Sequence, residues 1–176
     1  MLTFVGVLAG IVAVILIVAA ISPKGYSLQR NIVINRSVEE VFKYIVHLKN
    51  QDYYSKWVMT DPNMRKTFTG TDGQPGFIYA WDSDMKQAGK GEQEILSVVH
   101  NQELRYEVRF IKPFAGIAPS YIITNAIAEN ATNVTWGFAS KMPYPMNIVL
   151  LFMNMENMLG NDMNVSLNNL KVILER

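Results

Sequence analysis

The chain has 176 residues, of which 49% are hydrophobic, 16 are basic and 15 are acidic, and it contains no cysteine. A net charge of +1 gives no electrostatic basis for a nucleic-acid partner, and the lack of cysteine excludes disulfides and thiolate chemistry. The only two histidines, His47 and His100, lie far apart and lack a carboxylate-rich metal spacing around them. We therefore expect no metal and no cofactor.

The first predicted element is an apolar, uncharged run from Leu2 to Ile21, which ends before the first charged side chain, Lys24. A helix rises about 1.5 Å per residue, so this run matches the roughly 30 Å hydrocarbon core of a bilayer. We predict a single-pass transmembrane anchor at residues 1–22, with the membrane as the partner of residues 2–21.

The flanks of this run bear on its processing and its orientation. A cleaved secretory signal is the alternative, because Val18-Ala19-Ala20 offers a small residue at a cleavage position. The run lacks a basic n-region, however, and is longer than the about 7 to 15 residues of a signal core. Lys24, Arg30 and Arg36 all follow the run, so the positive-inside rule predicts that the rest of the chain is cytoplasmic.

After a short polar linker at residues 23–26, residues 27–176 have a length typical of one domain. Apolar and polar residues alternate from Ser27 to Asn35, which predicts a half-buried strand. Ser37 and Glu40 then have the spacing of a capping box, so we expect a helix to start there and to extend to about Lys49.

Further strand-like segments follow, separated by residues that favour turns. They are Met64–Thr69, Phe77–Trp81, Gly89–Val99, Leu104–Ile111, Tyr121–Glu129 and Asn133–Ala139. The final segment has apolar residues at helical spacing from Ile148 to Leu174, which predicts one long helix after Pro145. This order of elements predicts an α+β domain in which a seven-stranded antiparallel sheet wraps around the last helix.

Short motifs across the domain, each weak alone, occur in a characteristic order. They include Ile32-Val33-Ile34-Asn35, Val38-Glu39-Glu40-Val41-Phe42, Tyr54-Ser55-Lys56-Trp57, Pro75-Gly76, Gly89-Lys90-Gly91, Thr132-Asn133-Val134-Thr135-Trp136, Gly160-Asn161-Asp162 and Leu167-Asn168-Asn169-Leu170-Lys171. In this pattern the chain resembles the START-like (SRPBCC) superfamily, specifically its polyketide cyclase/dehydrase-related branch with an N-terminal membrane segment. The resemblance implies a helix-grip fold with an apolar cavity between sheet and helix, but no catalytic motif that could be transferred.

Aromatic and methionine side chains on the elements that should surround such a cavity are the candidate ligand contacts. They are Trp57, Tyr79, Trp81, Tyr106, Phe110, Trp136, Met155, Met158 and Leu159, to which we add Asp162. The same residues also fit an ordinary core. Asp162 falls on or beside the inward stripe of the last helix, where it would need a cationic partner such as Arg105 or Arg109, or it lies at the rim in water.

Three functions remain open at this point. We expect a membrane-anchored module that binds a hydrophobic small molecule or lipid. The second hypothesis is a cyclase/dehydrase-like enzyme that uses an acid such as Asp162, or a tyrosine hydroxyl, on a hydrophobic substrate. The third is an interaction module with a filled core and no ligand. A triad, a metal cluster and a nucleotide loop are all missing from the sequence, so we incline away from the enzyme.

Overall fold

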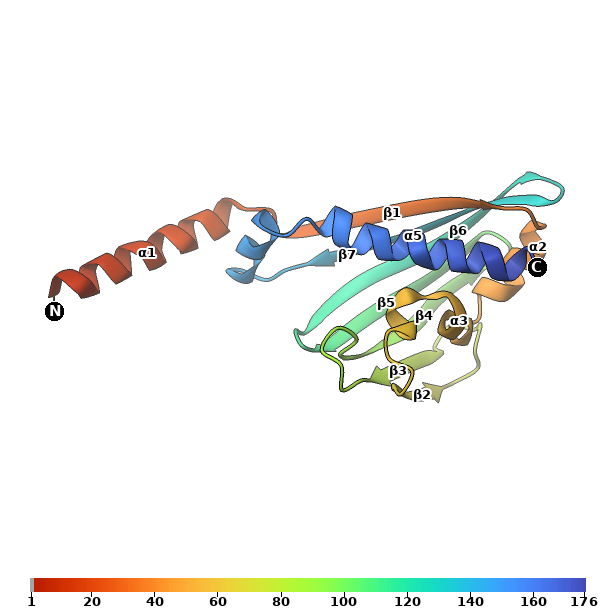
Figure 1. The fold of residues 1–176 in the computed structure, drawn as a ribbon, viewed down its shortest axis with the longest axis horizontal. Coiled ribbons are helices and arrows are strands. Elements are labelled where there is room, and N and C mark those ends of the chain that lie inside the picture. Colours follow the sequence, from red (N-terminus) through yellow and green to blue (C-terminus); the bar gives the residue numbers. More distant parts are fainter. Residues whose placement is uncertain (1) are drawn as a thin grey trace.

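Helix α1 (Leu2–Ile21) projects from one end of an α+β domain in the computed structural model, which describes residues 2–176 (Figure 1). The other helices are α2 (Val38–Ile45), α3 (Gln51–Tyr54), α4 (Lys56–Met59) and α5 (Met155–Leu174), with 3-10 turns η1 (Leu48–Asn50) and η2 (Met146–Leu151). The strands are β1 (Gly25–Ile34), β2 (Arg65–Thr69), β3 (Ile78–Asp82), β4 (Lys90–Val99), β5 (Glu103–Lys112), β6 (Gly116–Ala128) and β7 (Ala131–Lys141).

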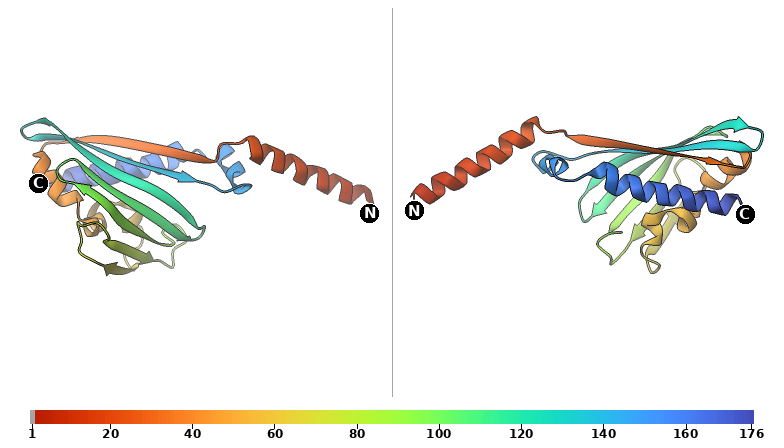
Figure 2. Two further views of the ribbon diagram at one scale, coloured as in Figure 1. Left: turned by 180° about the vertical axis from the view of Figure 1, so that it is seen from behind. Right: turned by 45° about the horizontal axis from the view of Figure 1, so that its top comes forward.

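The strands form one antiparallel sheet of seven, in the order β1-β7-β6-β5-β4-β3-β2. The register shifts at Lys90/Gly91 and Ile95/Ser97, where β4 pairs with β5, as it does at a β-bulge. Bulges bend a strand and increase its twist, and the sheet is correspondingly curved, with α5 lying across its concave face (Figure 2). This is the predicted helix-grip architecture, with an apolar helix at the N-terminus.

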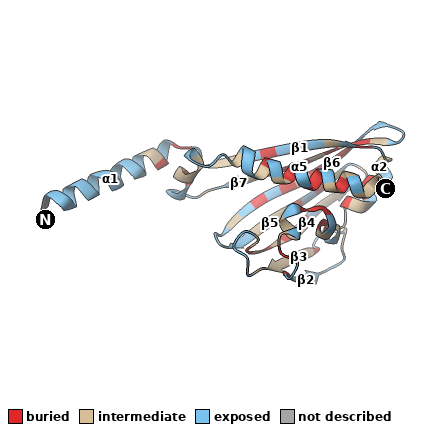
Figure 3. Ribbon diagram, in the orientation of Figure 1, coloured by how far each residue is buried: buried red, intermediate tan, exposed pale blue. Residues whose placement is uncertain are grey.

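The core lies between the concave face of the sheet and helices α2, α3 and α5. A buried stripe on α5, formed by Met163, Leu167 and Leu170, faces the sheet (Figure 3). It packs in one cluster with Phe42 of α2 and Leu104 of β5. The helical spacing of apolar residues in the last third of the chain therefore identified the side of α5 that is buried.

The predicted capping box is present at the start of α2. The Ser37 Oγ atom accepts a hydrogen bond from the Glu40 backbone N–H at 3.3 Å, and the Glu40 carboxylate accepts one from the Ser37 N–H at 3.2 Å. Each interaction pairs a backbone donor that a helix start leaves free. The helix is shorter than predicted, because it ends at Ile45 and the chain continues into η1.

The prediction of one continuous C-terminal helix is wrong. The segment forms η2 first, and α5 begins at Met155 after a break at residues 152–154. Asn154 stands at the N-cap of α5, where its side chain accepts a hydrogen bond from the Asn157 N–H at 2.9 Å. Because the asparagine side chain hydrogen-bonds to the backbone here, it favours a helix start over a continuing helix. The break was not predicted, because the apolar periodicity continues through it.

Strand boundaries also differ from the prediction, and two of these differences bear on the cavity. Strand β6 begins at Gly116, before the predicted start at Tyr121, and β1 begins at Gly25, inside the predicted linker. Both strands are extended toward the end of the sheet where α1 joins the domain. The extra length of β6 places Ala118 and Ser120 on the concave face, where both are buried.

Helix α1 is long and apolar enough to cross a membrane. Most of its side chains are exposed, and Ala19 near its C-terminal end is buried. An apolar helix without a polar face satisfies its backbone internally and loses nothing by contact with lipid. This observation establishes a candidate span.

Candidate ligand-binding cavity

A cavity of about 300 Å³ lies between the concave face of the sheet, helices α3 and α4, and the first turns of α5. Its apolar and aromatic lining consists of Tyr26, Trp57, Val58, Met64, Tyr79, Trp81, Ala88, Tyr106, Val108, Phe110, Ala118, Trp136, Phe138, Met155 and Leu159. Its polar lining consists of Gln51, Ser55, Gln87, Gln93 and Ser120. Within residues 2–176, no acidic, basic or histidine side chain lines this space.

Edge-to-face aromatic pairs form much of the wall. The Trp57 and Trp136 rings lie 5.6 Å apart between centroids, and Trp57 also meets Phe138 at 6.5 Å. On the opposite side, Trp81 packs edge-on against Phe110 at 6.3 Å. Such pairs prefer this geometry because the positive edge of one ring meets the negative face of the other. The wall is therefore held in shape by its own contacts.

The Trp81 ring depends on a neighbouring glycine. Trp81 pairs across the strands with Gly91, and a Cβ atom at Gly91 would lie 2.6 Å from the Trp81 ring. The indole Nε1 donates to the carbonyl oxygen of Ala88 at 3.0 Å, which fixes the ring over the β3–β4 connection. Gly91 thus leaves the space that allows a large aromatic side chain to lie flat on the sheet.

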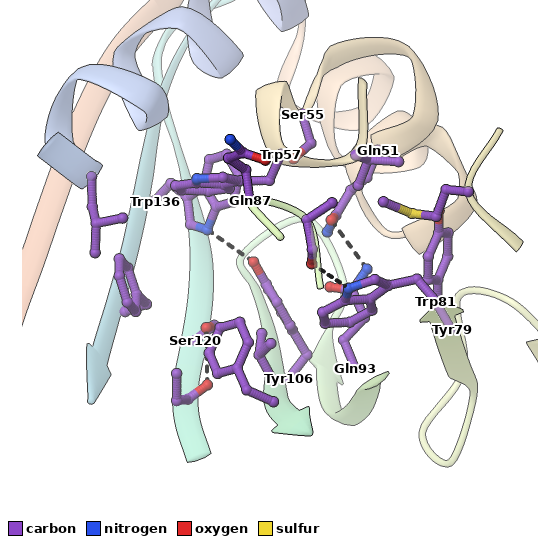
Figure 4. A pocket seen from close by; sticks show the side chains of 18 of the residues that line it. Gln51, Ser55, Trp57, Tyr79, Trp81, Gln87, Gln93, Tyr106, Ser120 and Trp136 are labelled. Atoms are coloured by element: carbon purple, nitrogen blue, oxygen red, sulfur yellow. Dashed lines mark hydrogen bonds between the residues drawn. The ribbon is translucent and has the colours of Figure 1, made fainter. Parts of the chain in front are cut away.

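A small polar centre lies inside this apolar wall (Figure 4). The Trp136 Nε1 donates to the Tyr106 hydroxyl at 2.8 Å, and the Gln93 Nε2 donates to the Gln51 Oε1 at 3.1 Å. Gln51 is only 4% exposed, yet its Nε2 has no hydrogen-bond partner among the described residues. A buried amide donor without a partner is costly, so this atom is available to an acceptor that enters the cavity.

The tyrosines of the cavity remain protonated near neutral pH. Burial raises the pKa of Tyr106, and the hydrogen bond from the Trp136 indole lowers it by less than burial raises it. Burial also raises the pKa of Tyr79, whose hydroxyl donates to the Asp52 carboxylate at 2.6 Å. Both phenols therefore act as hydrogen-bonding groups in this site.

All of the predicted contact residues line the cavity except Met158 and Asp162. Met158 is 46% exposed on the outer side of α5. The Asp162 carboxylate pairs with the Lys56 Nζ of α4 at 2.6 Å, outside the cavity lining. We leave both residues out of the candidate site.

The suggested cationic partners of Asp162 were wrong. Arg109 instead pairs with Glu92, Glu94 and Glu107 on the sheet, at 2.7, 2.7 and 3.2 Å. Arg105 pairs with Glu103 at 2.7 Å. The alternation of β5 places both arginines on the face opposite Tyr106, and that face turns away from α5.

The polar residues of the cavity were missed by the sequence analysis. Gln93 and Ser120 lie on strands at buried positions that alternate with less buried residues, so strand alternation could have placed them in the cavity. Gln51 lies on α3, which has only one turn and no periodicity to read. Tyr26 was assigned to the linker, although it belongs to β1 and lines the cavity.

A curved antiparallel sheet that holds a C-terminal helix over an apolar cavity defines a protein of the helix-grip class. Residues 26–175 match the family described as polyketide cyclase / dehydrase and lipid transport, and the chain belongs to this family. None of the curated proteins matches the chain.

Several solved structures share the fold. Norcoclaurine synthase from Thalictrum flavum is similar with a TM-score of 0.62 at 10% identity, over 91% of this chain and 92% of that one. The di-domain ARO/CYC protein StfQ of the steffimycin biosynthetic pathway has a TM-score of 0.62 at 8% identity, over 86% of this chain and 52% of its own. A protein from Chromobacterium violaceum has a TM-score of 0.58 at 14% identity, over 85% and 97%. At these identities the likeness establishes the fold alone.

Proposed function

We propose that the chain is a membrane-anchored module that binds a hydrophobic small molecule or lipid in the cavity between the sheet and α5. The observation that carries the proposal is an aromatic, uncharged lining around about 300 Å³ of space. An apolar ligand gains free energy in such a cavity because its surface and the lining leave water together. The family description, which includes lipid transport, supports the same class of ligand.

The ligand carries at least one oxygen acceptor, such as a carbonyl or a hydroxyl group. The Gln51 Nε2 is an unpaired donor at the cavity wall, and the Tyr106 hydroxyl accepts from Trp136 and retains its own proton. A ligand oxygen between these groups would satisfy a donor that is otherwise buried without a partner. A pure hydrocarbon would leave it unsatisfied, so we expect weaker binding of such a ligand.

The lining supports binding better than acid–base chemistry. The groups that face the cavity are amides, serine hydroxyls and phenols, and the phenols have pKa values raised by burial. Asp162, the carboxyl group considered for an enzyme, pairs with Lys56 outside the lining. Among the described residues no carboxyl, imidazole or amine group lines the ligand space, and we assign the cavity to recognition.

The proposed anchor is helix α1, and the proposed orientation places the domain in the cytoplasm. Lys24 is the first charged residue after α1, and Arg30 and Arg36 are the next basic residues along the chain, on the side that the positive-inside rule assigns to the cytoplasm. The short connection from Ile21 to Gly25 keeps the cavity near the bilayer surface. A ligand that leaves the membrane therefore meets the cavity at a raised local concentration.

Native mass spectrometry of the full-length protein, released from a mild detergent, tests the proposal. We expect adducts of hydrophobic mass that organic extraction removes, and a rise in melting temperature when a long-chain alcohol or ketone is added back. The corresponding hydrocarbon is the matched control ligand and should raise the melting temperature less. If no adduct is found and no member of the ligand panel raises the melting temperature, the proposed binding function is wrong.

A further inference from the structure

The segment Tyr144–Met153, between β7 and α5, exposes a cluster of large apolar side chains. Phe152 is 83% exposed, and Tyr144, Met146, Leu151 and Met153 are each more than a third exposed. Isolated apolar residues on a surface are ordinary, but a contiguous group of this size marks a site of contact. These side chains therefore indicate a surface that a partner covers.

A buried asparagine fixes this segment to the end of α1. Asn147 of η2 is fully buried, and its Nδ2 donates to the carbonyl oxygen of Ala19 at 2.7 Å and lies 3.3 Å from those of Ser22 and Pro23. The Ala19 carbonyl lies in the last turn of α1 and those of Ser22 and Pro23 come directly after it, where a helix leaves acceptors without partners. The apolar segment is thus held beside the point where the proposed anchor would leave the bilayer.

The β5–β6 hairpin reaches the same end of the sheet. Strand β5 ends at Lys112 and β6 begins at Gly116, next to the end of β7, since the Ser140 hydroxyl donates to the Ile117 carbonyl. Phe114, at the tip of the hairpin, is 72% exposed. Figures 1 and 2 both show this hairpin pointing toward the side of the domain from which α1 projects.

Exposed lysines accompany these apolar side chains. Lys24 follows α1, Lys141 ends β7 opposite Gly25, and Lys112 ends β5, and all three are exposed. Aromatic and aliphatic side chains combined with lysines are the composition that binds the interface of an anionic bilayer. The chemistry of this surface therefore matches lipid head groups and the upper part of the acyl chains.

A groove lies between this surface and the cavity. It has a volume of about 500 Å³ and lies between the start of β1 and residues 150–156, with Leu151, Phe152 and Met153 on one side and Pro23 and Gly25 on the other. Tyr26 and Met155 line both the groove and the ligand cavity. The two spaces are therefore neighbours that share these two side chains.

We infer that Tyr144–Met153 and Phe114 rest in the membrane interface, and that the groove between β1 and residues 150–156 is the route by which the ligand passes between the bilayer and the cavity. This inference rests on the proposed function, since it assumes both the anchor and a hydrophobic ligand. The groove is lined mainly by apolar side chains, with Asn154 and Glu156 as its polar members, so an acyl chain that follows this route stays largely in contact with apolar surface. The break between η2 and α5 gives the route its outer wall.

Two labelled variants test the position of the surface. The chain has no cysteine, so an environment-sensitive dye on Phe152→Cys reports from that position alone. The matched control is Ile127→Cys, 57% exposed on the β6–β7 hairpin at the opposite end of the sheet. In vesicles of phosphatidylcholine and phosphatidylserine, we expect lipid-borne quenchers to quench the dye at position 152 and not at 127.

A kinetic measurement tests the route. We expect Phe152→Asp to slow the transfer of a fluorescent fatty acid from the vesicles to the protein by about tenfold, because a carboxylate replaces the apolar contact with lipid. The affinity for the same fatty acid in detergent should not change, since Phe152 is outside the cavity lining. Ile127→Asp should leave both the rate and the affinity unchanged.

The results separate the two proposals. If the fatty acid binds in detergent, but the dye at position 152 is quenched no more than at 127 and Phe152→Asp transfers at the normal rate, the route is wrong and the proposed function stands. If the fatty acid and the rest of a hydrophobic panel fail to bind in detergent, the proposed function is wrong, and the route falls with it.

Discussion

The indole Nε1 of Trp136 on β7 donates a 2.8 Å hydrogen bond to the hydroxyl of Tyr106 on β5, across the intervening strand β6. Both side chains are almost fully buried, at 4% and 2% exposure. The bond satisfies the only donor of the indole and orients the phenol at the cavity wall, so one interaction contributes to both the stability of the fold and the polar centre.

Replacement of Tyr106 by phenylalanine should lower both stability and affinity. The indole N–H of Trp136 would lose its partner while still buried, which costs about 1–3 kcal/mol of unfolding free energy. The matched control is Tyr121→Phe, whose hydroxyl donates to Gln29 on the outer face and which should change stability by less than about 0.5 kcal/mol. Thermal unfolding of the full-length protein in detergent measures the stability of both variants. Equal effects of the two variants would contradict this role of the Trp136–Tyr106 bond.

Replacement of Gln51 by leucine should change ligand preference more than stability. The variant removes the unpaired donor and the acceptor of Gln93 while keeping the side chain at a similar size. We expect the affinity for an alcohol or ketone to fall by about three- to tenfold, the equivalent of one hydrogen bond, and that for the hydrocarbon of equal length to be kept or raised. Titration with the paired ligands measures the ratio. An unchanged ratio would show that Gln51 does not contact the ligand oxygen.

A side chain at Gly91 should disturb the aromatic wall. In Gly91→Ala the new Cβ would lie 2.6 Å from both the Trp81 ring and the Arg109 carbonyl oxygen, so the ring must move. We expect a loss of about 1–3 kcal/mol of unfolding free energy and a change in tryptophan fluorescence. Gly116→Ala is the control on the same sheet, because no atom lies within 4 Å of its Cβ position. If both variants are equally stable, Trp81 does not lie as described.

Stability should fall at alkaline pH. Burial raises the pKa of Tyr54, Tyr79 and Tyr106 above the ordinary value of 10.0. The folded protein then keeps protons that the unfolded chain loses, so this stabilising contribution is complete below the unfolded pKa and is lost as the pH rises above it.

We therefore expect the free energy of unfolding to decrease from about pH 9 upward. The decrease should be shallower in Tyr106→Phe, which lacks one of the buried phenols, than in the unaltered protein. Denaturation at a series of pH values, with the same detergent and salt throughout, measures the slope. An identical alkaline slope in the Tyr106→Phe variant would contradict the burial of this phenol.

The periodicity of the sequence predicted the fold because it reports burial directly. Alternation in Ser27–Asn35 and helical spacing in the last segment both arise from one apolar face, and the structure buries Leu28, Ile34, Met163 and Leu167 accordingly. The break before α5 was missed because capping by Asn154 is a local hydrogen-bonding choice that leaves the apolar spacing intact. Element boundaries were accordingly less well predicted than the elements.

The sequence analysis predicted the large aromatic and apolar residues of the candidate site and missed its polar residues. Trp81 and Tyr106 combine size with strand alternation, and the structure places both at the cavity. Asp162 was placed by its helical position, but that position lies at the flank of α5, where α4 brings Lys56 to it. Gln51 became part of the site through the tertiary packing of a one-turn helix, which no local pattern encodes.

The central claim is that an apolar ligand occupies the cavity between the sheet and α5, and filling that space tests it most directly. Ala118 is buried and lines the cavity, whereas Ala126 lies on the same strand and is exposed. We expect Ala118→Phe to remain folded and to lose most of its binding of a fluorescent fatty acid in detergent titrations, while Ala126→Phe binds like the unaltered protein. Equal binding by the two variants, both shown to be folded by circular dichroism, would contradict the account.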